Sequence, residues 1–139
     1  MIVLDTSVVS EIMKAAPEES VAGWIAEQAE ASLYITSITQ AEILYGIQRL
    51  GAGKRRSALE AAADAMFSED FAGRVLAFGT DAARAYARIA FQRQRAGKPI
   101  SQFDAQIAAI TFVARATLAT RDLAGYEGCG VKLLNPWYA

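Results

Sequence analysis

The sequence contains no histidine and only one cysteine, Cys129, among its 139 residues. These absences exclude Ser-His-Asp and Cys-His nucleophilic sites, histidine metal ligands and histidine acid–base pairs. A single cysteine also excludes a disulfide within the chain, which fits a reducing cytoplasm. An enzyme built from this chain would therefore use carboxylates, hydroxyls, arginines, lysines or a bound metal or cofactor.

Long apolar runs and a strong charge bias are also missing. No apolar run approaches the ~20 residues that cross a membrane, and no basic leader precedes Asp5, so neither a membrane span nor a signal peptide is expected. The formal net charge is −1, so binding to nucleic acid would need a local basic patch. With 53% hydrophobic residues and no linker or repeat, we predict one globular domain over residues 1–139.

Short apolar segments alternate with helical patterns along the chain. Strands are expected at 2–4, 33–37, 74–78, 116–120 and 131–134, and helices at 6–13, 18–30, 39–50, 54–67, 80–96 and 102–115. This alternation favours an α/β fold with a parallel sheet of about four to five strands, covered by helices on both faces.

For two of the expected helices, the sequence also predicts which side chains are buried. In the helix at 39–50, which Gly51 would end, we expect Ala41, Leu44, Tyr45 and Leu50 to face inward. The helix at 102–115 is apolar nearly all round, which indicates a buried element.

Four carboxylates lie near the expected ends of strands. Asp5 directly follows the first strand, Glu42 lies in the first turn of the helix after the second, and Asp122 comes two residues after residues 116–120. Asp104 opens the apolar helix, where a charge is costly unless another group satisfies it. Ligands of open parallel sheets bind at the carboxyl ends of the strands.

Each acid also has a purely structural interpretation. "TQAE" (39–42) reads as a capping box with Thr39 at the N-cap, "SQFD" (101–104) fits it more loosely, and Asp5 and Asp122 could cap a helix or a turn. Placed together, however, four acids would repel one another, and a divalent cation would relieve that repulsion. Carboxylate oxygens suit hard ions such as Mg²⁺ or Mn²⁺.

Four blocks of the sequence resemble, in order, those of PIN-domain ribonucleases, and most of all the VapC-type toxins of bacterial toxin–antitoxin pairs. The blocks are "VLDTSVVSE", "ITSITQAEILYGI", "SQFDAQIAAI" and "LATRDLAGYEGCGVKLLNPW". The resemblance implies a three-layer α/β/α sandwich and a cytoplasmic, Mg²⁺- or Mn²⁺-dependent endoribonuclease that leaves 5′-phosphate and 3′-hydroxyl ends. It also implies a cognate antitoxin as partner and a homodimer.

The resemblance places Asp5, Glu42, Asp104 and Asp122 at the acidic metal site, with Thr6 and Thr120 as supporting hydroxyls. One departure concerns the last block. Many relatives read "TRN" with an Asp-Phe pair three residues later, whereas this chain has Asp122 in place of that Asn and Gly125–Tyr126 in place of the pair. The resemblance therefore supports Asp122 less directly than the other three acids.

In the expected mechanism, one or two metal ions would polarise a phosphate of RNA. A carboxylate, with Asp104 as the candidate, would orient the attacking water. Arg84, Arg88 and Arg95 lie within about 40° of one another on the helix at 80–96 and could follow the RNA backbone, as could "GKRR" (53–56), although both could be ordinary solvated surface. The alternative function is a non-catalytic module whose acidic pocket docks a basic peptide.

Overall fold

The computed structural model describes residues 1–139 and contains a five-stranded sheet with helices on both faces. All strand pairs are parallel, and the strand order is β3-β2-β1-β4-β5. The strands are β1 (Ile2–Leu4), β2 (Leu33–Thr36), β3 (Val75–Leu76), β4 (Thr117–Ala119) and β5 (Lys132–Leu134). The predicted fold class is confirmed, and β1 is the central strand of the sheet.

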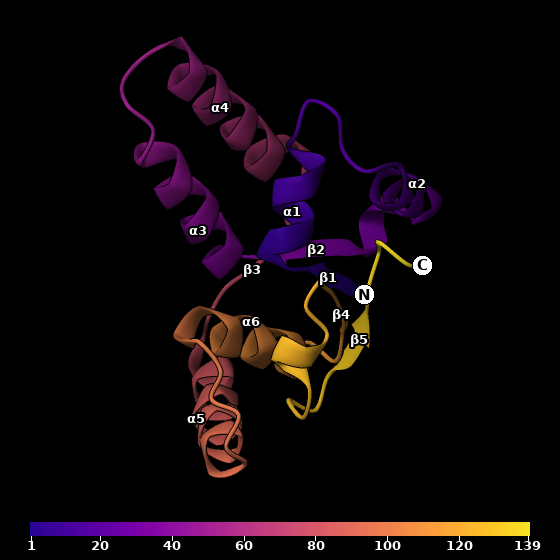
Figure 1. Ribbon diagram of the computed structural model, residues 1–139, viewed down its shortest axis with the longest axis vertical. Coiled ribbons are helices and arrows are strands. Elements are labelled where there is room, and N and C mark those ends of the chain that lie inside the picture. The colour runs from indigo at the N-terminus through magenta and orange to yellow at the C-terminus, as the bar shows by residue number, and fades with distance from the viewer.

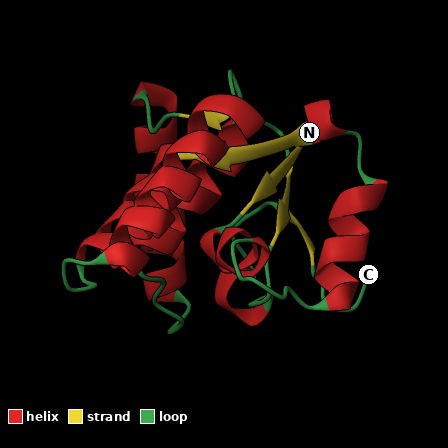
Figure 2. Cartoon of the chain, turned by 90° about the horizontal axis from the view of Figure 1, so that it is seen from above, coloured by secondary structure: helices red, strands yellow, loops and turns green.

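Six α-helices cover the sheet, four on one face and two on the other (Figures 1 and 2). The first face carries α1 (Thr6–Ile12), α2 (Glu19–Glu27), α3 (Ser37–Gln48) and α4 (Lys54–Ala65), and the second carries α5 (Thr80–Arg95) and α6 (Gln102–Val113). None of these helices is long and apolar enough to cross a membrane. Short 3₁₀ segments cover Glu30–Ser32 and Ala124–Tyr126, and a π-helix covers Met66–Asp70.

Strand β1 joins the two halves of the core because successive side chains of a strand point to opposite faces. Leu4 belongs to the cluster under α1–α4, whereas Val3 belongs to the cluster under α5 and α6, and both are fully buried. This burial on both faces explains why the strand is a continuous apolar run. The backbone amide of Asp5 then donates to the carbonyl of Ala119, which ties the end of β1 to β4.

The buried face of α3 differs from the prediction. Thr39, Ile43 and Ile47 are its buried residues, whereas Ala41 and Tyr45 are exposed. Leu44 and Leu50 are only partly buried. The helix is apolar on more than one side, so periodicity alone did not select the stripe that packs on the sheet. The burial predicted for α6 is correct along most of its length, because Ala105 and every residue from 107 to 111 are buried.

Candidate active site

Asp5 reaches the edge of the sheet at the end of β1 and also caps α1. Its Oδ1 accepts hydrogen bonds from the backbone amides of Ser7 (3.0 Å) and Val8 (3.3 Å), and from the Ser7 hydroxyl. Its Oδ2 accepts from Thr120 Oγ1 at 2.7 Å. Burial raises the pKa of the Asp5 carboxyl, against the opposing effect of these hydrogen bonds. The capping and site interpretations of Asp5 are therefore compatible, because they use different oxygens.

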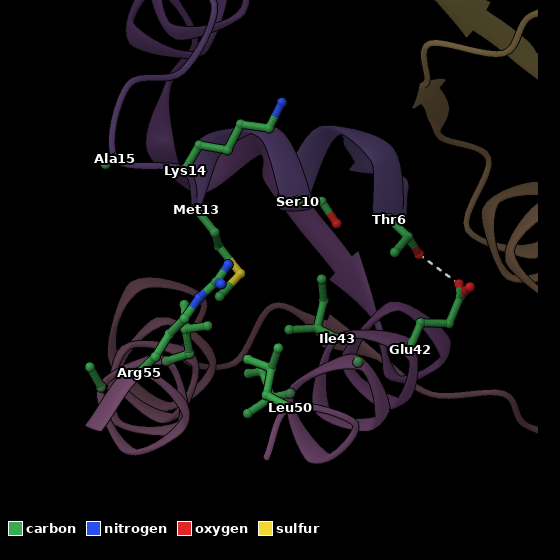
Figure 3. Close-up of a pocket in the computed structure, with 13 residues that line it drawn as sticks. Thr6, Ser10, Met13, Lys14, Ala15, Glu42, Ile43, Leu50 and Arg55 are labelled. Atoms are coloured by element: carbon green, nitrogen blue, oxygen red, sulfur yellow. Dashed lines mark hydrogen bonds between the residues drawn. The ribbon is translucent and has the colours of Figure 1, made fainter. Parts of the chain in front are cut away.

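Glu42 is oriented by a group of threonines rather than by a capping box. The N-cap of α3 is Thr36, whose hydroxyl accepts from the Thr39 amide, so the predicted capping role of Thr39 and Glu42 is wrong. Thr6 Oγ1 instead donates to Glu42 Oε1 at 2.7 Å (Figure 3). Since that hydroxyl has one proton, the 3.0 Å contact between Thr6 and Thr39 requires Thr39 to donate to Thr6.

Asp104 lies in the first turn of α6, close to a buried tyrosine. Its backbone amide donates to the hydroxyl of Ser101, which is the N-cap, but the Asp104 carboxylate does not accept from the Ser101 amide, so only half of the predicted capping box forms. Its Oδ1 accepts from the hydroxyl of Tyr126 at 3.0 Å, and its Oδ2 accepts no hydrogen bond. The sequence patterns mark Tyr126 only as a departure from the family pattern and predict no contact between it and Asp104.

Electrostatics link three of the four predicted acids. Burial raises the pKa of Glu42, and the negative charges of Asp104 and Asp5 add to this effect. Burial also raises the pKa of Tyr126, with further contributions from the charges of Asp5, Asp104 and Glu42. None of the three acids forms an ion pair with a lysine or arginine. The structure thus brings Asp5, Glu42 and Asp104 around one place without a compensating cation.

Asp122 has different surroundings. Its Oδ1 accepts from the backbone amide of Gly125 at 2.9 Å, which closes a turn, and its charge is not among those that shift the pKa of Glu42 or Tyr126. Its own amide donates to Thr120 Oγ1, the hydroxyl that also bonds Asp5. Thr120 therefore contacts the site as expected, whereas the Asp122 carboxylate has the turn-forming role.

The donor chemistry of these groups fits a hard divalent cation, because every available atom is a carboxylate or hydroxyl oxygen. Glu42 Oε2 and Asp104 Oδ2 accept no hydrogen bond, and Asp5 Oδ2 accepts only one. As the side chains stand, however, no three Asp, Glu or Cys side chains form a group that could hold a metal ion. The predicted four-acid metal site stays a prediction.

A groove of about 740 Å³ lies between α1, α3 and α4 and begins at this site (Figure 3). Thr6 and Glu42 are at one end, and Arg55 and Met13 are at the other. Most of its lining is apolar and includes Ile43, Ile47, Leu50 and Leu59. The groove therefore runs from the acids along a mostly apolar surface.

The parallel sheet, its helical layers and the acids at the strand ends define the class of protein. Residues 2–126 match the model of the PIN domain, and the chain belongs to this family. It is 41% identical to the VapC ribonuclease Y4jK of Sinorhizobium fredii over 99% of this chain and 98% of that protein. It is 35% identical to toxin FitB of Neisseria gonorrhoeae over 99% of each chain. The crystal structure of FitAcB from the same organism superposes with a TM-score of 0.93, at 34% identity and with full coverage of both chains.

Proposed function

We propose that this chain is a divalent-metal-dependent endoribonuclease that acts in the cytoplasm as the toxin of a toxin–antitoxin pair. The observation that carries the proposal is the approach of Asp5, Glu42 and Asp104 from the β1–α1 junction, α3 and α6, with no ion pair from any of them to a lysine or arginine. The names of the relatives, a VapC ribonuclease and a toxin, support the same activity.

Asp5, Glu42 and Asp104 would hold Mg²⁺ or Mn²⁺, and Asp122 would join them if its turn rearranged. The bound ion would polarise the scissile phosphate and lower the pKa of a coordinated water. Thr6 fixes the direction of the Glu42 carboxylate, and Ser7 and Thr120 fix that of Asp5. Asp104, with one oxygen free of hydrogen bonds, would orient the water that attacks phosphorus.

The exposed face of α5 is the candidate for RNA backbone contacts. Arg84, Arg88 and Arg95 are all exposed. Arg88 lies over the ring of Phe112, 4.4 Å from its centre, and Arg95 lies 5.9 Å from the ring centre of Phe91. Alternating arginines and aromatic rings suit a single-stranded nucleic acid, whose phosphates and bases they would contact.

The proposed partners are an antitoxin and a second copy of this chain. A segment of the antitoxin would occupy the groove between α1, α3 and α4, with a basic residue beside Glu42. The alternative function, a non-catalytic module that docks a basic peptide, uses the same groove and acids. RNA cleavage separates the two functions.

The test measures cleavage of total bacterial RNA and of a labelled single-stranded RNA by the purified protein. We expect cleavage with Mg²⁺ or Mn²⁺, none with EDTA, and a loss of at least about 100-fold in Asp104→Asn and Asp5→Asn. Asp64→Asn, an exposed acid on α4, is the matched control and should cleave normally. Full activity in either site variant would contradict the assignment. If no RNA is cut under any condition while a basic peptide binds, the docking module is favoured instead.

A further inference from the structure

Tyr126 places a phenol inside the acidic cluster. Only 2% of the residue is exposed, and its ring packs in the core cluster under α5 and α6. Its hydroxyl donates to Asp104 Oδ1, across 22 positions of the sequence. A phenol is protonated at neutral pH, and a carboxylate oxygen can only accept, so Tyr126 is the hydrogen-bond donor in this contact.

Arg93 of α5 holds the segment that carries this tyrosine. Its side chain is buried and forms no ion pair, although a buried guanidinium is costly without partners. Nη1 donates to the carbonyls of Gly125 (2.8 Å) and Glu127 (2.9 Å), the two neighbours of Tyr126, and Nε donates to the Lys98 carbonyl. The guanidinium thus fixes the backbone on both sides of the tyrosine.

Gly125 fixes the same segment from the other side. A Cβ at this position would lie 2.2 Å from Asp122 Oδ2, so the carboxylate of Asp122 occupies the space that any larger residue would need. The Asp122 side chain can therefore bond the Gly125 amide and close the turn. The place of Tyr126 follows from two independent constraints on its immediate neighbours.

We propose that Tyr126 is a positioning residue for Asp104, an inference that rests on the proposed metal-dependent function. The backbone of Asp104 is already held by the Ser101 cap, so the side-chain torsions are the remaining freedom. The phenol fixes these torsions through Oδ1 and leaves Oδ2 unbonded. Without this donor, repulsion from Asp5 and Glu42 favours rotation of the Asp104 carboxylate toward solvent.

The experiment compares Tyr126→Phe, which removes only the hydroxyl, with the wild type. Binding of Mn²⁺ is measured by isothermal titration calorimetry, and melting is measured in EDTA. We expect about tenfold weaker Mn²⁺ binding, as is typical when a partner of a metal ligand is lost. We also expect kcat for RNA to fall with little change in KM. Tyr86→Phe is the matched control, because the Tyr86 hydroxyl forms no hydrogen bond and its ring packs on Phe78; it should bind Mn²⁺ like wild type.

The Asp104→Asn variant distinguishes a failure of the proposed metal site from a failure of the positioning role of Tyr126. If the wild type binds Mn²⁺ no better than Asp104→Asn, the proposed metal site is wrong and the role of Tyr126 falls with it. If Asp104→Asn loses binding while Tyr126→Phe retains wild-type affinity and kcat, the positioning role alone is overturned. A purely structural role for the phenol would lower the melting temperature in EDTA without changing the affinity, which also overturns it. If Tyr126→Phe does not fold, Gly125→Ala, which displaces the neighbouring turn, replaces it with the same expected loss of affinity.

Discussion

Asp5 shows how a single side chain can serve the fold and the site together. Oδ1 is saturated by the first turn of α1, whereas Oδ2 has one protein donor, Thr120. The cap fixes the Asp5 carboxylate where the buried strand ends. The Asp5 side chain therefore loses little further conformational freedom if it binds a metal ion. A rigid strand followed at once by a cap explains why an apolar run ends on a carboxylate so early in the chain.

Glu42 should make stability depend on pH. Its raised pKa means that the folded protein retains the Glu42 proton more strongly than the unfolded chain. From the ordinary value of 4.5 up to the raised value, the folded state therefore binds more protons, and the free energy of unfolding falls as pH rises. Glu42→Gln keeps an acceptor for Thr6 but has no proton to lose. In EDTA, the variant should equal wild type below about pH 4 and become more stable toward pH 7, by less than about 1 kcal/mol because the side chain is partly exposed.

Urea denaturation of both proteins between pH 3.5 and 7.5 measures this difference. Glu69→Gln, an exposed acid outside the cluster, shows what removal of any one negative charge does. A difference between Glu42→Gln and wild type that does not vary with pH would show that the Glu42 pKa is not raised by the fold.

Three acids could be placed from the sequence, but the tyrosine could not. Asp5, Glu42 and Asp104 each follow a recognisable strand or helix start, and parallel strands end at one edge of a sheet. The place of Tyr126 depends instead on Arg93, Gly125 and Asp122, which act through backbone carbonyls and a turn. Nothing in "AGYEG" indicates such contacts, because Arg93 lies 32 positions before Gly125 in the sequence and no local pattern relates the two.

At the level of elements, α3 shows the limit of hydrophobic periodicity. Its boundaries were predicted within two residues, yet its inward face was wrong, because apolar side chains at 38, 43, 44, 45 and 47 surround much of the helix. Sheet contact selects the β-branched Ile43 and Ile47 for burial. The exposed side, including Tyr45, remains available to a partner. The boundaries of the other elements lie within three residues of the prediction, and the largest difference is at α2, which ends at Glu27 rather than at residue 30.

Two substitutions on α3 test this orientation. Ile47 is 5% exposed and Tyr45 is 66% exposed. Ile47→Ala should lower the free energy of unfolding by about 2–4 kcal/mol, since it leaves a cavity in the core. Tyr45→Ala, which removes the larger side chain, should change it by no more than about 0.5 kcal/mol. Urea denaturation measures the free energy of unfolding of both variants. Equal decreases would support the orientation predicted from the sequence, in which Tyr45 faces inward.

The role proposed for the arginines of α5 can be tested by the salt dependence of RNA binding. If their shared face contacts RNA phosphates, replacing Arg84, Arg88 and Arg95 with alanine should weaken binding and make it less dependent on salt, by about 0.7 in the logarithmic slope for each lost phosphate contact with a single strand. Binding is measured by fluorescence anisotropy with Asp104→Asn as the background, so that RNA is not cut. An unchanged slope would identify the three arginines as solvated surface.

At the scale of the whole molecule, the unpaired acids should link metal binding to global stability. Asp5, Glu42 and Asp104 repel one another in the metal-free protein, and a cation that binds only the folded state stabilises it. For a dissociation constant on the order of 1 mM and ~10 mM Mn²⁺, the gain is about 1.4 kcal/mol. In a domain of this size, that gain raises the melting temperature by roughly 3–8 °C.

The melting temperature of Asp104→Asn, compared with that of wild type, should differ in opposite directions without metal and with Mn²⁺. Without metal, it removes one of the repelling charges and keeps an oxygen for the Tyr126 donor, so it should melt at or above the wild-type temperature. With Mn²⁺, it should gain much less than wild type, because one ligand is lost. A role limited to the first turn of α6 predicts another result, a loss of up to about 1 kcal/mol with or without metal. Melting curves of both proteins at fixed ionic strength, with Mn²⁺ and with EDTA, decide between these roles. If wild type shows no Mn²⁺-dependent shift and Asp104→Asn is less stable throughout, Asp104 serves only the helix, and the acids do not form a metal site.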